Sequence, residues 1–150
     1  RLEVFRPRAT AQNTALDLHT SSLNGSVSVD RDRLGEVVDN LVANAMDAVK
    51  EGGRVLVEAA RSGASNQLVI RVADTGPGVL LAMRDRLFEP FATTKDSGMG
   101  LGLFLSAEIV RGLGGEISYL DAEEILSQSA CAQSVPSIST GACFEVRVPC

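Results

Sequence analysis

The stretch that decides the fold is Gly98-Met99-Gly100-Leu101-Gly102-Leu103-Phe104-Leu105, where three glycines occupy every second position. Glycine lets the backbone approach another group closely and adopt φ angles that other residues avoid. The apolar residues from here on recur at helical spacing and predict a helix to about Arg111, with Leu101, Leu105, Ile109 and Leu113 on one face. The start of such a helix presents N–H groups that attract phosphate. A flexible loop before an ordinary core helix explains the stretch equally well.

Two familiar phosphate-binding loops are excluded. No Gly-Lys-Ser/Thr follows the glycines, as a P-loop requires, and the third glycine comes one position too early for a dinucleotide fold. Whether the stretch holds a nucleotide therefore depends on the rest of the chain.

The composition is that of a single globular domain. The chain has 150 residues, 45% hydrophobic and 22% charged, with a net charge of −5. Its scattered basic residues argue against nucleic-acid binding, and no apolar run approaches the ~18 residues of a membrane span. Residues 1–12 have no clear period and are expected to be a linker or N-terminal extension, with one domain over 13–150. Cys131, Cys143 and Cys150 lack metal-ligand spacing, which indicates reduced thiols.

A long helix is expected from the Asp30 cap to about Lys50, before Gly52-Gly53. Its apolar face should comprise Leu34, Val37, Val38, Leu41, Ala45, Ala48 and Val49. Its polar face should comprise Arg33, Glu36, Asn40, Asn44 and Asp47. Asparagine is a weak helix former, so Asn40 and Asn44, one turn apart, indicate a row of oxygen ligands for a cation such as Mg²⁺ more than a merely wet face.

Strand patterns surround this helix. Ala15–His19 and the pair Val27 and Val29 predict short strands, and Arg54–Ala60 with Gln67–Asp74 predicts a hairpin. Asp74 shares a strand face with three core residues, so its carboxylate should lie at the end of the sheet and accept hydrogen bonds. Thr75-Gly76-Pro77-Gly78 follows as a tight turn, and Asp74 alone is also explained as a turn cap.

The segment from Leu87 to Lys95 places Phe88 and Phe91 around a helix-breaking proline. It indicates a hinged loop anchored by both aromatics, or a loop plugged into the core, with Thr93, Thr94 and Lys95 able to reach a ligand. Strands Glu116–Leu120 and Phe144–Val148 close the chain. The order of elements predicts a two-layer α/β sandwich, with helices on one face of a mixed sheet.

These pieces resemble, in order and spacing, the catalytic ATP-binding domain of bacterial sensor histidine kinases. Their wider superfamily includes DNA gyrase B, heat-shock chaperone and mismatch-repair ATPases, which share a Bergerat-type ATP-binding fold. Residues 40–48 are similar to the N box of the family and residues 74–78 to its G1 box. Residues 88–91 resemble the F box and residues 98–103 the G2 box.

The resemblance implies a site for ATP and Mg²⁺ between the long helix and a lid. Asp74 would accept from the adenine amino group, with Gly76 and Gly78 beside the base. Asn44 would coordinate Mg²⁺, and Asn40 would support it through water or phosphate contacts. Asn40 and Lys95 are the catalytic candidates, and the remaining cofactor-binding candidates are Asp47, Thr93, Thr94, Gly98, Met99, Gly100, Leu101, Gly102 and Leu103. Threonine often stands in the family where Cys143 does, which puts a water-mediated adenine contact there in question.

The phosphate acceptor in this family is a histidine on separate dimerisation helices of the same parent kinase, and a response regulator acts downstream. His19 lacks the acidic neighbour of that histidine, so the chain is expected to bind ATP without carrying its own acceptor. The resemblance implies a cytoplasmic domain without nucleic-acid or membrane contact, and leaves membrane anchoring of the parent open.

Three alternatives remain. Gyrase-like or chaperone-like ATPases place a glutamate base four residues before the Mg²⁺-binding asparagine, where this chain has Asn40. The anti-sigma serine kinases tend to carry that glutamate too. A pseudokinase docking module would use nucleotide only as a ligand.

Overall fold

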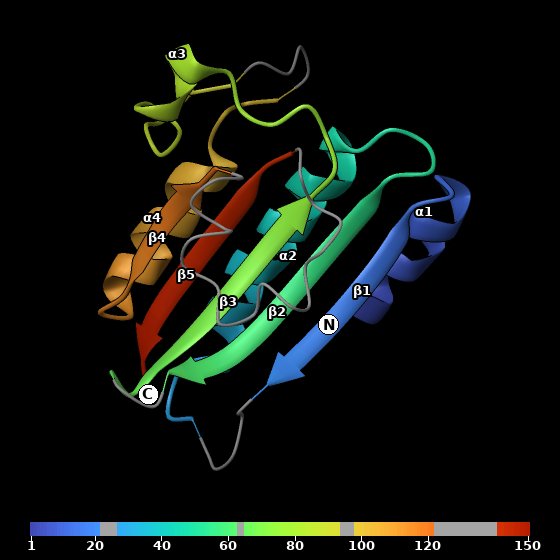
Figure 1. Cartoon of the computed structure of the whole chain (residues 1–150). Coiled ribbons are helices and arrows are strands. Elements are labelled where there is room, and N and C mark those ends of the chain that lie inside the picture. Colours follow the sequence, from blue (N-terminus) through green and yellow to red (C-terminus); the bar gives the residue numbers. More distant parts are fainter. Residues whose placement is uncertain (22–26, 63–64, 94–97, 122–140) are drawn as a thin grey trace.

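The computed structural model describes residues 1–21, 27–62, 65–93, 98–121 and 141–150 (Figure 1). These residues contain both helices and strands. The elements are η1 (Leu2–Phe5), α1 (Arg6–Ala11), β1 (Ala15–Ser21), α2 (Arg31–Ala48), β2 (Arg54–Ser62), β3 (Gln67–Asp74), α3 (Leu81–Arg84), α4 (Gly102–Gly112), β4 (Glu116–Leu120) and β5 (Cys143–Pro149).

One five-stranded sheet organises the described residues, with the strand order β1-β2-β3-β5-β4. β1 pairs with β2 in parallel, and the other three pairs are antiparallel. Helices α2 and α4 lie together behind this sheet (Figure 1). The expected two-layer sandwich, with helices on one face of a mixed sheet, is confirmed. None of the helices in these residues has both the length and the apolar character needed to cross a membrane.

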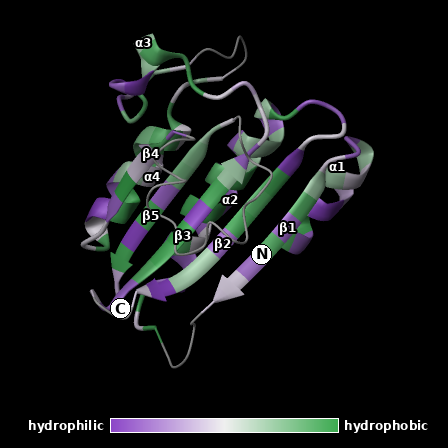
Figure 2. Cartoon of the chain, viewed as in Figure 1, coloured by the Kyte–Doolittle hydropathy of each residue, from purple (hydrophilic) through white to green (hydrophobic). Residues whose placement is uncertain are grey.

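The core forms between the sheet and α2. Apolar residues make up much of the central strands (Figure 2), and every second residue of a strand faces the helices. The buried residues of this layer come from α2 with its C-cap Val49, from α4 and from the three central strands: Leu34, Val37, Leu41, Val42, Ala45, Met46, Val49, Val55, Val57, Leu68, Ile70, Val72, Val110, Phe144, Val146 and Val148.

The opposite face of the sheet carries a second, smaller apolar cluster made of Leu56, Ala73, Leu120 and Cys143. Cys143 is paired with Ala73 in the sheet, so its side chain points away from the helix layer. Burial raises the pKa of the Cys143 thiol to about 12.

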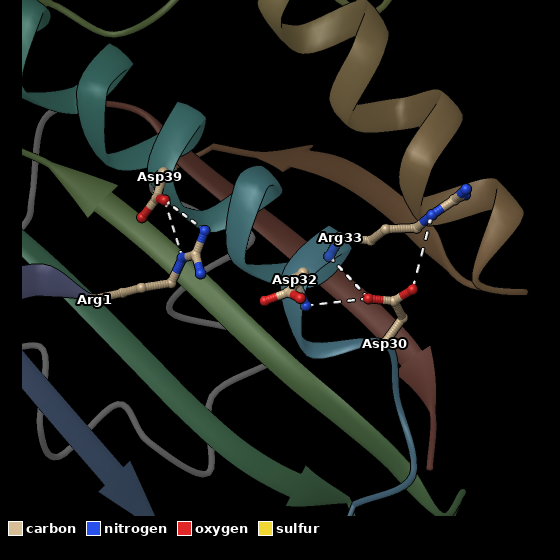
Figure 3. Close-up of polar contacts among 5 residues, drawn as sticks. All are labelled: Arg1, Asp30, Asp32, Arg33 and Asp39. Carbon is tan, nitrogen blue, oxygen red and sulfur yellow. Dashed lines mark hydrogen bonds and ion pairs between the residues drawn. The ribbon is translucent and has the colours of Figure 1, made fainter.

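Helix α2 begins at its predicted cap. The carboxylate of Asp30 accepts from the backbone N–H groups of Asp32 and Arg33, both at 3.1 Å (Figure 3). These are two of the first-turn donors that a helix cannot satisfy internally. Two turns further on, Asp39 pairs with Arg1 at 2.9 Å, which ties the N-terminal segment to α2 (Figure 3).

The sequence was misleading at its N-terminal side. Residues 1–12, expected to be a linker or N-terminal extension without a clear period, contain η1 and α1, and Ala9 is buried in the main core. Val27 and Val29 form no strand; they are half-buried and pack on the core as single side chains. Two alternating residues without a neighbouring strand to pair with do not make a sheet edge.

The apolar face of α4 was predicted only in part, because Ile109 and Leu113 pack on the core but Leu105 does not. Leu105 is 49% exposed, whereas Ser106, Ala107 and Val110 are buried. Small residues at 106 and 107 let α4 approach α2 closely, and a count of large apolar residues does not detect such a face.

We predict that Asp30→Ala lowers the free energy of unfolding by about 1 kcal/mol, because two backbone donors lose their acceptor. Chemical denaturation measures this change. Asp30→Ser supplies a hydroxyl cap and should retain most of the stability, so equal losses in the two variants would contradict the capping role.

Candidate functional site

The polar residues of α2 do not all lie on one solvent-exposed face. Asn40 and Asn44 are half-buried, whereas Asp47 is exposed. Asp47 forms an ion pair with Arg8 of α1 at 2.5 Å. The two asparagines thus lie one turn apart along the middle of α2, and Asp47 helps to hold α1 on the domain surface.

Asp74 lies at the end of β3 and is 3% exposed. Its Oδ1 accepts from the backbone N–H groups of Gly76 at 2.8 Å and Ala142 at 3.4 Å. Burial raises the pKa of the Asp74 carboxyl above its ordinary value, and these two donors offset that shift only in part. Within the described part of the chain both hydrogen bonds end at Oδ1, and none ends at Oδ2.

The turn after Asp74 packs against the end of α2. A Cβ on Gly76 would lie 2.8 Å from the carbonyl oxygen of Ala48, so only glycine brings the turn this close. On its other side, Gly141 adopts φ +119°, and a Cβ there would lie 1.7 Å from the Asp74 carbonyl oxygen. These two glycines let α2, β3 and the start of β5 meet around one carboxylate.

Side chains fix the turn from both ends. Thr75 Oγ1 accepts from the backbone N–H of Arg54 at 2.9 Å. Arg84 of α3 donates to the Val79 carbonyl at 3.4 Å and pairs with Asp121 at 3.3 Å. Its guanidinium also lies 5.1 Å from the centre of the Tyr119 ring. The turn is therefore held between the sheet and α3.

Helix α4 meets α2 at Asn40. The Asn40 side-chain Nδ2 donates to Ser106 Oγ at 2.9 Å. A Cβ on Gly102 would lie 2.5 Å from Asn40 Oδ1, so the missing side chain at Gly102 makes room for the amide. Leu101 precedes the helix without a side-chain cap, so the first backbone N–H groups of α4 are suited to an anion.

Gly100, two residues before Gly102, also has a packing role. Gly100 has φ +65°, and a Cβ there would lie 2.6 Å from the backbone carbon of Phe91. Phe88 packs edge-on against Phe144, with ring centres 6.3 Å apart. Phe91 is 73% exposed, so the expectation that both aromatics anchor the loop is wrong for Phe91. Phe88 anchors with its ring and Phe91 contacts Gly100 through its backbone.

The remaining predicted ligand residues are placed only in part. Thr94 and Lys95 lie outside the described residues. Thr93, Gly98, Leu101 and Leu103 are half-buried, and Met99 is exposed. Leu103 packs on the main core, so its side chain serves the fold. Nucleotide contacts by this group stay a prediction.

The described residues contain no cluster of three or more histidine, cysteine or acidic side chains that could hold a metal alone. Mg²⁺ does not need such a cluster, because it is usually bound through one or two protein oxygens together with phosphates and water. Asn44 offers such an oxygen.

Sequence reasoning missed Ser106 and the backbone donor of Ala142. Ser106 lies inside a leucine-rich helical pattern, where a buried hydroxyl gives no signal. Ala142 acts through its backbone, which any residue could supply. The glycine at 141, just before the final strand, was the one available hint of a close approach.

Comparisons with known proteins agree with this geometry. Residues 29–150 match the family described as histidine kinase-, DNA gyrase B-, and HSP90-like ATPase. The alginate biosynthesis sensor protein KinB of Pseudomonas aeruginosa is 35% identical over 116 residues, which cover 76% of this chain and 19% of that protein. The C4-dicarboxylate transport sensor protein DctB of Rhizobium meliloti is 40% identical over 88 residues, covering 59% and 14%. The chain thus spans about a fifth of these relatives or less.

Solved structures share the whole fold. The catalytic domain of histidine kinase ThkA superposes with a TM-score of 0.79 at 25% identity, covering 99% of this chain and 86% of that one. Full-length ShkA in complex with AMPPNP gives a TM-score of 0.78 at 28% identity, covering 98% and 28%. From the match over residues 29–150, the chain belongs to the family of histidine kinase-, DNA gyrase B- and HSP90-like ATPases.

Proposed function

We propose that this chain is the catalytic domain of a sensor histidine kinase, which binds ATP with Mg²⁺ and transfers the γ-phosphate to a histidine. The acceptor would lie on dimerisation helices of the same parent protein, and a response regulator would receive the phosphate next. The similar proteins named above are sensor proteins and histidine kinases.

The observation that carries the nucleotide assignment is the carboxylate of Asp74. Its Oδ1 is held by two backbone donors, and its Oδ2 is suited to accept from an exocyclic amino group such as that of adenine. The contact of Gly76 with Ala48 places this carboxylate at the end of α2. Asn44 and Asn40 lie about one and two turns back from Ala48, so a nucleotide with its base at Asp74 would direct its phosphates toward them and the start of α4.

Phosphoryl transfer is favoured over ATP hydrolysis by Asn40. A hydrolase needs a base to activate water, and the amide of Asn40 cannot take a proton. It is also engaged with Ser106. Glu36, one turn earlier, is exposed. Kinases need little covalent chemistry from the protein, since positioning and charge neutralisation lower most of the barrier.

In this assignment Mg²⁺ neutralises phosphate charge, with Asn44 as its protein ligand and Asn40 in support. The proposal also retains five further residues as nucleotide contacts: Asp47, Gly78, Thr93, Thr94 and Lys95. The domain would act in the cytoplasm, where ATP and a response regulator are present.

We predict that Asp74→Asn weakens ATP binding roughly 100-fold, because a charge-assisted hydrogen bond contributes about 1.5–3 kcal/mol. Calorimetry with ATP and inosine triphosphate measures this loss. Inosine triphosphate lacks the amino group, so the wild type should discriminate against it and the variant should not. The exposed Asp32→Asn change is the matched control. Unchanged discrimination in Asp74→Asn would remove the adenine assignment.

The same variant should not lose stability at neutral pH. A carboxyl whose pKa is raised in the folded state stabilises the fold only while protonated, and that contribution is lost as the pH rises through the folded pKa. Asp74→Asn should therefore unfold at an equal or higher denaturant midpoint at pH 7. Its advantage should shrink toward about pH 3.9, the ordinary pKa of aspartate. A large loss of stability at pH 7 would contradict the described environment of Asp74.

We expect Asn44→Ala to weaken ATP binding about tenfold or more with Mg²⁺ present, because the loss of a metal ligand weakens the binding of Mg²⁺ that accompanies ATP. Affinity measured in EDTA should change little. Asp39→Ala, on the same helix but in a surface pair with Arg1, is the control. Equal losses with and without Mg²⁺ would assign Asn44 to another role.

Labelling with γ-³²P-ATP tests the whole proposal. The chain alone should release phosphate slowly, whereas the parent kinase with its helical domain should acquire acid-labile phosphohistidine. Rapid phosphate release by the chain alone would favour an ATPase. ATP binding without any labelling of the parent would favour a docking module.

A further inference from the structure

The contact between Asn40 and Ser106 joins two helices that are far apart in the sequence. Ser106 is 2% exposed, and its Oγ accepts from Asn40 Nδ2 at 2.9 Å. A buried hydroxyl requires a hydrogen-bond partner, and the Asn40 amide supplies it. The contact therefore constrains the amide as well as the packing of α4.

Gly102 is the second residue of α4 that contacts the Asn40 amide. It is the first residue of α4, one turn before Ser106. The Cβ that Gly102 lacks would lie 2.5 Å from Asn40 Oδ1 and 3.2 Å from Asn40 Nδ2. The amide thus lies along α4, with its oxygen against the first residue of the helix and its nitrogen bonded one turn further in.

An asparagine amide has an accepting end and a donating end. Rotating the Asn40 amide by half a turn would bring its carbonyl to Ser106 and its NH₂ group to the start of α4. The positive end of the α4 dipole favours an oxygen at that position over an NH₂ group. The Ser106 hydroxyl can accept from or donate to the amide, so it holds the amide in place in either orientation. The start of α4 therefore selects the orientation in which the oxygen lies beside it.

We propose that Ser106 is a positioning residue that holds the Asn40 amide against α4, where the start of the helix selects its orientation, so that Asn40 presents its acceptor oxygen to metal-bound water instead of its NH₂ group to a phosphate. The inference rests on the proposed function and decides between the two contacts that the family resemblance left open for Asn40. Residues that orient the groups around a metal commonly affect its affinity about 10–100-fold.

The test is Ser106→Ala, which removes the acceptor and keeps a good helix former. The half-saturating Mg²⁺ concentration for binding of a fluorescent ATP analogue should rise roughly tenfold, with little change in affinity in EDTA. Gly102→Ala should raise it as well, because the added methyl displaces Asn40 Oδ1.

Two comparisons separate positioning from packing. Val110→Ala loosens a buried position of α4 that is one turn beyond Ser106, and it should lower stability without changing the Mg²⁺ requirement. In the Asn40→Ala background, Ser106→Ala should add no further change to that requirement. Additive effects, or a shift in Val110→Ala equal to that in Ser106→Ala, would overturn the inference.

A measurement without nucleotide or metal tests the hydrogen bond between Asn40 and Ser106 directly. The side-chain amide of Asn40, assigned by its loss in Asn40→Ala, should give two well-dispersed NMR signals that collapse toward free-amide positions in Ser106→Ala. A wild-type chain that binds no Mg²⁺-ATP overturns the proposed function and this inference together. A wild-type chain that binds it, with an unchanged Mg²⁺ requirement in Ser106→Ala, overturns this inference alone.

Discussion

The arrangement of the site depends on how one buried carboxylate is hydrogen-bonded. Asp74 ends the central strand β3, and two backbone N–H groups converge on its Oδ1 from the turn at Gly76 and from Ala142. Burying a charge costs stability unless donors compensate for it, and its raised pKa shows that the compensation is partial. Among the described residues no further donor reaches Oδ2, and this is the observation behind the proposed adenine contact.

Helix α2 is the element that connects the parts around this carboxylate. Near its end, the backbone of Ala48 touches the turn at Gly76, and in its middle the amide of Asn40 rests on Gly102 and Ser106. The alternating glycines therefore have separate tasks. Gly100 admits the backbone of the Phe91 loop, and Gly102 admits the Asn40 amide. Phosphate contacts at the start of α4 would add to these packing roles without replacing them.

Local signals predicted much of this from sequence. The Asp30 cap, the β2–β3 hairpin and the inward-facing Asp74 follow from neighbouring residues, whose turn chemistry and alternation are visible in the chain. What depended on distant contacts was missed. The exposure of Leu105 and Phe91 and the role of Ser106 are set by how closely α4 approaches α2 and the loop. The parallel pairing of β1 with β2 likewise depends on a crossover through α2.

The central claim is that Asp74 reads an adenine base while the asparagines of α2 face its phosphates. A crystal structure of the chain with AMPPNP and Mg²⁺ tests this most directly. The account predicts the exocyclic nitrogen of the base within about 2.7–3.2 Å of Asp74 Oδ2, and the metal beside Asn44. A base bound elsewhere, with Asp74 facing only water, would contradict it.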